Sequence, residues 1–333
     1  MIALALAASM TLTPLEAGTS ARLQAVSVAS DDVIWASGLE GAFVRSIDGG
    51  ASWRAGVVTG SEERQFRDVH AVDADTAYLL SAGPGDASRI YKTVDGGASW
   101  SLQFVNAIPE AFFDCMDFWD EDHGIAYSDS VDGKIMMIRT SDGETWEPID
   151  SSRLPDALEG EGGFAASGTC VAVHGESTAH VAMGVNSARI LRTRDRGESW
   201  TVIDTPVPHG NQTSGLTSVA FIDDGVGVVA GGDIAAPESY DDTVAVTEDG
   251  GDSWWRVAGP TFPGAVYGIA FVPGAPTRSF VAVGPGGASY SLDNGSTWES
   301  LSTDSYWSVA FTPSGTGFLV GPEGRLARVT ASF

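Results

Sequence analysis

Short apolar segments with alternating small residues recur seven times along the 333 residues of the chain. Alternation over four to six positions is typical of strands rather than helices. We expect first strands at residues 23–28, 68–72, 115–118, 170–173, 216–221, 266–271 and 307–311. A second strand follows each of them, as at residues 33–37 and 76–80. This pattern predicts an all-β chain built from seven repeated units.

One eight-residue phrase recurs between these segments. It reads SIDGGASW at 46–53, TVDGGASW at 93–100, TRDRGESW at 193–200, TEDGGDSW at 247–254 and SLDNGSTW at 291–298, with a shorter copy, TSDGETW, at 140–146. Successive terminal tryptophans are 47, 46, 54, 54 and 44 positions apart. A period of about 40–50 residues with strand-rich filling is typical of a β-propeller.

Asp, Gly and Ser or Thr in this phrase favour a tight turn, because the side-chain oxygens bond nearby backbone N–H groups and Gly tolerates positive φ. We expect each copy to join the two outer strands of a blade, with its Trp packed on the neighbouring strand. The structural residues of the six copies are Asp48, Trp53, Asp95, Trp100, Asp142, Trp146, Asp195, Trp200, Asp249, Trp254, Asp293 and Trp298.

The phrase resembles the Asp-box, or BNR repeat, of the photosystem II stability/assembly factor-like (YCF48-type) propellers and, more distantly, of sialidase-like propellers. The resemblance covers nearly the whole chain and implies the fold. Because hydrolases, receptors and assembly factors all carry this repeat, it leaves the activity open.

Seven first strands but six repeated phrases leave the last unit one strand short. The unit ends after a strand at 325–329, while residues 10–15 alternate like a strand without a unit of their own. We expect this N-terminal strand to complete the seventh blade, so that no edge is left unpaired. Residues 10–333 are then a single seven-bladed propeller. Residues 1–9 are interpreted either as the end of a truncated signal segment or as a disordered N-terminus; we expect the former, and with it an exported, periplasmic or secreted protein.

The chain is strongly acidic, with 18 Lys plus Arg against 44 Asp plus Glu and a net charge of −26. Such a surface disfavours nucleic acid and anionic membranes, which both require basic patches. It suits high salt, a cationic partner or an extracytoplasmic setting. No segment has the length of an internal transmembrane helix, and we expect a monomer.

The two cysteines, Cys115 and Cys170, form no metal-binding motif. Both open a first strand, in neighbouring blades, and therefore lie near the central channel. The two cysteines form either a disulfide or two separate buried thiols. We expect thiols, because adjacent inner strands can be too far apart for a disulfide.

The first strands of blades 2 and 3 carry charged or reactive side chains at positions where other blades have small residues. In blade 5, for example, two neighbouring positions on one face of the first strand are the small residues Ser218 and Ala220. At the corresponding positions blade 2 has Asp68 and His70, and blade 3 has Cys115 and Asp117. Asp114 flanks the second pair. Because charged groups are rarely buried without partners, the cluster is either a site with acid–base groups or a polar network that holds two blades in register.

Long segments on one face of the ring offer a second candidate region. They span residues 128–134, 151–168, 206–215 and 231–242. Long loops on a rigid scaffold are where binding residues concentrate. We expect Asp129, Asp132, Phe164, His209 and Asp233 to rim a mouth over blades 2–5, above the channel cluster.

The sequence is compatible with three functions. The first is a non-catalytic binding or assembly protein that recruits a protein partner, or a glycan or small molecule, through this face and has no cofactor or metal. The second is a glycoside hydrolase with candidate catalytic residues Asp117, His70 and Asp233, or with carboxylates from Asp129 and Asp132. A sialidase is disfavoured because Arg67 is the sole candidate for its arginine triad. The weakest is an oxidoreductase that uses Cys115 and His70.

Overall fold

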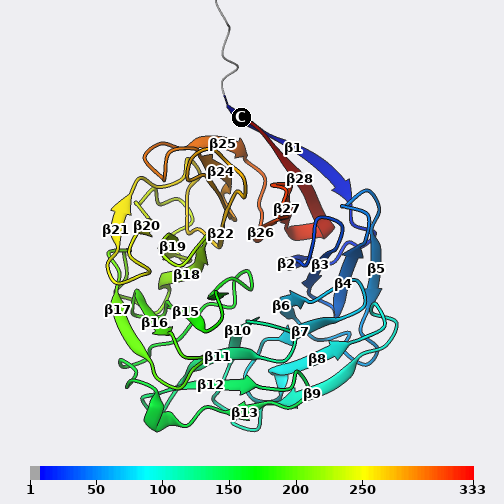
Figure 1. Ribbon diagram of the computed structural model, residues 1–333, viewed down its shortest axis with the longest axis vertical. Helices are drawn as coiled ribbons and strands as arrows, with labels where there is room; N and C mark the ends of the chain where they lie inside the picture. The colour runs from blue at the N-terminus through cyan, green and yellow to red at the C-terminus, as the bar shows by residue number, and fades with distance from the viewer. Residues whose placement is uncertain (1–7) are drawn as a thin grey trace, which may run out of the picture.

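The computed structural model describes residues 8–333 as seven four-stranded antiparallel sheets arranged around a central axis (Figure 1). In each sheet the first strand lies nearest the axis and the fourth forms the outer edge. This is the predicted all-β, seven-bladed propeller. Among residues 8–333, no helix has the length and apolar character needed to cross a membrane.

The strands of the first four blades follow in chain order. Blade 1 contains β2 (Leu23–Val28), β3 (Ile34–Gly38), β4 (Ala42–Ser46) and β5 (Arg54–Val57). Blade 2 contains β6 (Phe66–Ala71), β7 (Ala77–Ser81), β8 (Arg89–Thr93) and β9 (Ser101–Val105). Blade 3 contains β10 (Phe113–Phe118), β11 (Gly124–Val131), β12 (Lys134–Thr140) and β13 (Glu147–Pro148). Blade 4 contains β14 (Val171–His174), β15 (Thr178–Met183), β16 (Arg189–Thr193) and β17 (Thr201–Asp204).

The remaining three blades complete the ring. Blade 5 contains β18 (Ser214–Phe221), β19 (Gly227–Asp233), β20 (Val244–Thr247) and β21 (Trp255–Val257). Blade 6 contains β22 (Gly268–Phe271), β23 (Phe280–Gly284), β24 (Gly287–Ser291) and β25 (Glu299–Ser302). Blade 7 contains β26 (Ser308–Phe311), β27 (Gly317–Val320), β28 (Arg325–Ser332) and β1 (Ser9–Glu16). Three short 3-10 turns lie at Gly85–Ala87, Ser151–Arg153 and Pro322–Gly324.

The first and last strands of the chain close the ring. β1 pairs with β28 in antiparallel register from Ser9 opposite Ser332 to Glu16 opposite Arg325. This confirms the prediction that the N-terminal strand completes the seventh blade, and the pairing starts one residue earlier than expected. The remaining part of the predicted signal segment, residues 1–7, lies outside the described residues.

The six repeated phrases form the turns between the third and fourth strands of blades 1–6. In blade 2, Asp95 accepts hydrogen bonds from the backbone N–H of Ser99 (2.8 Å) and from its hydroxyl (2.6 Å), while Thr93 Oγ1 accepts from Gly97 N (3.0 Å). The same bonds recur at Asp48, Asp195, Asp249 and Asp293. The Asp and Ser or Thr side chains thus accept hydrogen bonds from backbone N–H groups of the same turn, so the turn is stabilised by local contacts.

The tryptophans of these turns pack between neighbouring blades. Trp100 in blade 2 makes edge contacts with Trp35 and Phe43 in blade 1, and Trp53 in blade 1 does the same with Phe318 in blade 7. The aromatic rings thus join blades as well as closing turns, which places the hydrophobic core in the seams between sheets.

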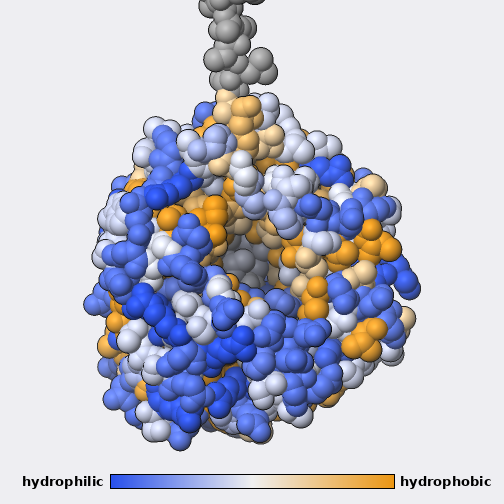
Figure 2. Space-filling view, viewed as in Figure 1, coloured by the Kyte–Doolittle hydropathy of each residue, from blue (hydrophilic) through white to orange (hydrophobic). Residues whose placement is uncertain are grey.

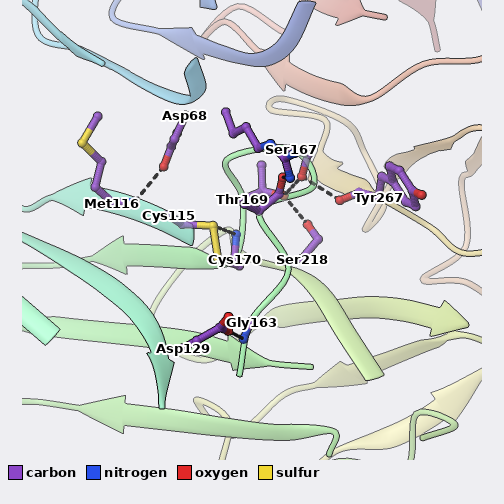
Figure 3. Close-up of a disulfide and its surroundings, with 12 residues drawn as sticks. Asp68, Cys115, Met116, Asp129, Gly163, Ser167, Thr169, Cys170, Ser218 and Tyr267 are labelled. Carbon is purple, nitrogen blue, oxygen red and sulfur yellow. Dashed lines mark hydrogen bonds between the residues drawn. A yellow bond between two sulfur atoms is a disulfide. The ribbon is translucent and has the colours of Figure 1, made fainter. Parts of the chain in front are cut away.

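A disulfide joins Cys115 of β10 to Cys170, directly before β14, with the two Cα atoms 5.8 Å apart (Figure 3). The expectation of two separate thiols is therefore wrong. The two cysteines occupy equivalent positions in adjacent blades, and first strands converge toward the axis. Their separation there falls within the range that a disulfide spans.

Candidate functional site

The ring has two faces, which differ in the connections between strands that they carry. The repeated turns and the turns after each first strand lie on one, which we call the turn face. The turns between second and third strands and the passages from blade to blade lie on the other, the crossover face. Figure 2 shows a face of the molecule on which a central hollow is surrounded by mostly hydrophilic residues with apolar patches among them.

The segment that connects β13 to β14 was expected to lie at the rim of the channel. In the structure it also enters the channel. We call residues 161–169 the channel plug. Ser167 Oγ donates to the Tyr267 carbonyl of blade 6 (2.6 Å), and Ser308 of blade 7 donates to the Ser167 carbonyl (2.9 Å). Thr169 shares a hydrogen bond with Ser218 of blade 5 (2.7 Å; Figure 3). The plug is thus bonded to blades on the far side of the axis.

Acidic side chains hold the start of the plug. Asp129 Oδ1 accepts from Gly163 N (2.8 Å), and burial raises the pKa of Asp129 to about 6. Burial also raises the pKa of Asp114, which is 1% exposed, well above its ordinary value, and the nearby Asp129 adds to this rise. Glu161 is paired with Arg189 through both carboxylate oxygens. Asp129, which was expected to rim an open mouth, therefore holds the plug through Gly163, while Asp114 is buried in the same region.

On the turn side of the plug, the channel holds a cavity of about 460 Å³ lined by Asp68, His70 and Asp117. His70 Nδ1 lies 3.1 Å from Asp117 Oδ1. The structure therefore brings three of the predicted residues together. A half-buried imidazole beside a carboxylate is a pair that can transfer a proton to a bound molecule.

Both carboxylates are also bonded to the neighbouring blade. Asp68 Oδ2 accepts from Met116 N (2.7 Å), and Asp117 Oδ2 accepts from Val173 N (2.8 Å). Ser27 of blade 1 accepts from Ala71 N of blade 2 in the same way (3.0 Å). The acidic positions thus follow a rule of the ring, in which a first-strand side chain binds the backbone of the next blade. This geometry favours the polar network over a dedicated acid–base site.

The oxidoreductase hypothesis requires a free thiol at Cys115, but the sulfur of Cys115 forms the disulfide with Cys170. Within residues 8–333, no group of three His, Cys, Asp or Glu side chains is arranged to hold a metal ion.

Three of the predicted rim residues lie apart from both the channel cavity and the plug contacts. Asp132 is exposed at the tip of the β11–β12 hairpin, with a φ of 52°. His209 is exposed, and its Nδ1 lies 2.9 Å from the Val207 carbonyl. Asp233 accepts from Thr213 Oγ1 and Asn211 Nδ2, and the bond from Thr213 lowers the pKa of this carboxyl. Phe164 lies within the plug itself and packs beside Gly184.

A second set of channel residues was missed by the sequence analysis. Each member directly precedes the position that Ala25 occupies in blade 1 and Asp68 in blade 2, and in blades 1, 2, 3 and 5 it lies at a β-bulge. Bulges re-aim side chains at the rims of closed sheets. We call this set the mouth ring, which comprises Gln24, Arg67, Asp114, Thr169, Thr217, Tyr267 and Trp307.

The mouth ring varies far more in chemistry than the small residues next to it. It combines an amide, a guanidinium, a carboxyl, two hydroxyls, a phenol and an indole, and four of its members, Gln24, Arg67, Tyr267 and Trp307, line one pocket. The signal was present in the sequence as the position immediately before each aligned small residue. It was overlooked because a bulge shifts this position out of the strand alternation.

No family model matches the chain, and no curated protein matches it. Among solved structures, it is similar to YCF48 bound to D1 peptide, with a TM-score of 0.65 and 16% identity over 95% of this chain and 96% of that one. YCF48 from Cyanidioschyzon merolae gives a TM-score of 0.67 and 15% identity over 96% and 98%. A streptogramin B lyase gives 0.69 and 11% over 97% and 98%. At these identities the likeness shows the seven-bladed fold.

Proposed function

We propose that the protein is a non-catalytic binding or assembly propeller that recruits a protein partner through its crossover face. In this respect it would act like the photosystem II stability/assembly factor-like proteins. One observation carries the proposal: the long loops of the ring lie on the crossover face and expose large apolar side chains there, namely Ile108, Leu158, Ile234 and Tyr240, whereas the exposed apolar residues Ile47 and Val94 of the turn face lie in short turns. Exposed apolar residues on loops held by a rigid scaffold are typical of protein-binding surfaces.

The contacts of the candidate carboxylates support binding over hydrolysis. Asp117 is bonded to the backbone of blade 4, Asp129 to the plug, and Asp233 to Thr213 and Asn211. A glycosidase needs two carboxyl groups free to face one glycosidic bond. The solved structure of YCF48 with a peptide gives a precedent for peptide binding on this fold.

We also propose that the protein works outside the cytoplasm. The Cys115–Cys170 disulfide supports this setting, because such bonds persist in oxidising compartments. The acidic surface, with its net charge of −26, favours a partner with a basic contact region.

The proposal is tested by affinity capture from native extract with two matched double variants. Leu158→Asp with Tyr240→Asp adds two charges to the crossover face, and Ile47→Asp with Val94→Asp adds the same charge to the turn face; all four residues are exposed. We expect the captured partner to be lost only in the crossover-face variant. Equal capture by both variants, or loss only in the turn-face variant, would exclude the crossover face as the binding surface.

A further inference from the structure

A small pocket lies on the crossover side of the plug, where the mouth ring meets residues 164–166. Its volume is about 160 Å³, and its walls include Arg22, Gln24, Arg67, Tyr267 and Trp307. Blades 1, 2, 6 and 7 contribute these side chains, so the pocket exists only in the closed ring. Ile234, one of the exposed apolar residues of the binding surface proposed above, also lines this pocket, whereas the channel carboxylates Asp68 and Asp117 do not.

Two guanidinium groups, those of Arg22 and Arg67, line this pocket without a carboxylate partner among the described residues. Both lysines and most arginines of the chain pair with an Asp or Glu. Within residues 8–333, Arg22 and Arg67 lie in salt-bridge distance of no carboxylate. Seven of the sixteen arginines make no salt bridge among residues 8–333, and Arg22 and Arg67 are the two of these seven that line this pocket.

The contacts of Arg67 and Arg22 fix their positions without neutralising them. Arg67 donates to Gln65 Oε1 (2.7 Å) and to the Ala165 carbonyl of the plug (3.4 Å). The Cζ atom of Arg22 lies 5.0 Å from the centre of the Trp307 ring. Burial, followed by the repulsion from Arg22, lowers the pKa of Arg67 despite the attraction of Asp114. Asp114 is thus the carboxyl that attracts Arg67 most, and burial raises the pKa of Asp114 itself.

The floor of the pocket holds a polar group without a partner. Gln24 is 3% exposed, and its Oε1 has no hydrogen-bond partner among the described residues. An amide oxygen accepts hydrogen bonds, so a carboxylate ligand would not satisfy it; the Nε2 group of the same amide is the one that can donate to an anionic head group. Gln24 therefore contributes one donor group to the same cavity as the two arginines.

A groove of about 410 Å³ continues from the pocket and shares Ile234, Tyr267 and Trp307 with it. Three prolines, Pro237, Pro263 and Pro285, line the groove. The arginines are therefore at one end of a longer, largely apolar site. Such a site suits a molecule with an anionic head and an apolar extension.

We propose that this pocket binds a carboxylate, with the guanidinium groups of Arg22 and Arg67 and the amide of Gln24 contacting the head group and Tyr267 and Trp307 flanking the attached apolar group. Guanidinium is the side chain best matched to carboxylate oxygens. The carboxylate belongs either to a free organic acid or to the carboxyl terminus of a peptide, and the two sources are separated below.

The test is calorimetric titration of the full-length protein with two probes and their uncharged counterparts. The probes are phenylacetate, compared with phenylacetamide, and the peptide acetyl-Ala-Ala-Phe, compared with its C-terminal amide. We expect saturable binding of at least one acid and none of its amide. Tighter binding of phenylacetate assigns a free acid, and tighter binding of the peptide assigns a carboxyl terminus. No binding of either acid, or equal binding of acid and amide, would overturn the proposal.

Matched arginine variants locate the binding. Arg22→Gln and Arg67→Gln should each raise the Kd of the bound acid by at least about tenfold. Arg54→Gln on the outer strand β5 removes the same charge from an exposed position and should leave the Kd within about twofold. Arg22 makes no hydrogen bond to the plug, so its variant remains informative if Arg67→Gln disturbs the fold. An unchanged Kd in the Arg22 variant would contradict the site.

Discussion

The Asp68 carboxylate of blade 2 accepts a 2.7 Å hydrogen bond from the backbone N–H of Met116 in blade 3. Asp117 makes the equivalent bond to Val173 in blade 4. The acidic residues that break the small-residue rule of the first strands thereby join successive blades. Their positions near the channel follow from this structural role.

Removing the Asp68 acceptor should destabilise the ring. Asp68→Ala leaves the Met116 N–H without a partner in a buried seam, and we expect a loss of about 1–3 kcal/mol in the free energy of unfolding. Asp68→Asn keeps an acceptor oxygen and should cost less. Urea unfolding of the three proteins measures the difference. Equal stability of the Ala variant and the wild type would mean that the bond contributes nothing.

The disulfide should stabilise the same region. Cys115 and Cys170 are 55 positions apart, so the bond restricts a long loop in the unfolded chain. We expect Cys115→Ala with Cys170→Ala to lower the free energy of unfolding by roughly 2–4 kcal/mol. Wild type unfolded under reducing conditions is the control and should lose a comparable amount. If the reduced and oxidised proteins unfold at the same urea concentration, the bridge has no role in stability.

The tryptophans of the repeated turns should behave as core residues. Trp100 contacts Trp35 and Phe43 across a blade seam, and Trp100→Ala should cost about 3–5 kcal/mol. Trp255 is adjacent to such a turn but 40% exposed, so Trp255→Ala should cost less than about 1 kcal/mol. Thermal or urea unfolding compares them. Similar losses in both variants would show that Trp100 does not act as a seam residue.

Asp129 should make stability depend on pH. Burial raises its pKa from the ordinary 3.8 to about 6, so between these values the folded protein holds more protons than the unfolded chain. This group therefore lowers the free energy of unfolding as pH rises from about 4 to 6, by at most about 3 kcal/mol. Asp129→Asn should remove that dependence and raise stability at pH 7.5 relative to wild type.

Urea midpoints between pH 4 and 8 measure this effect. Asp132→Asn, in the exposed tip of the same hairpin, serves as the matched control and should stay within about 0.5 kcal/mol of wild type. A wild-type pH profile retained by Asp129→Asn would assign the dependence to other groups.

The repeated turns were predictable because their chemistry is local. Asp95 and Thr93 satisfy the turn backbone by themselves, so spacing and residue type suffice to locate it. The strand order and the closing role of the N-terminal strand follow from counting units. The disulfide was misjudged because the distance between Cys115 and Cys170 depends on how strongly the first strands converge.

The site was harder to predict because it depends on long-range placement. The plug residue Ser167 bonds to Tyr267 and Ser308, which are 100 and 141 positions away. No local pattern indicates that this segment enters the channel. Arg22 and Arg67 meet only when the ring closes, and the bulge at Arg67 removes it from the strand alternation.

The most direct test of binding at the crossover face is photo-crosslinking in native extract. A photoreactive residue replaces Tyr240, which is 70% exposed on the crossover face, or Val94, which is 66% exposed on the turn face. We predict that one discrete protein is crosslinked at position 240 and not at position 94, and that Asp117→Asn leaves this product unchanged. Crosslinking at position 94 alone, or loss of the product in Asp117→Asn, would contradict binding through the crossover face.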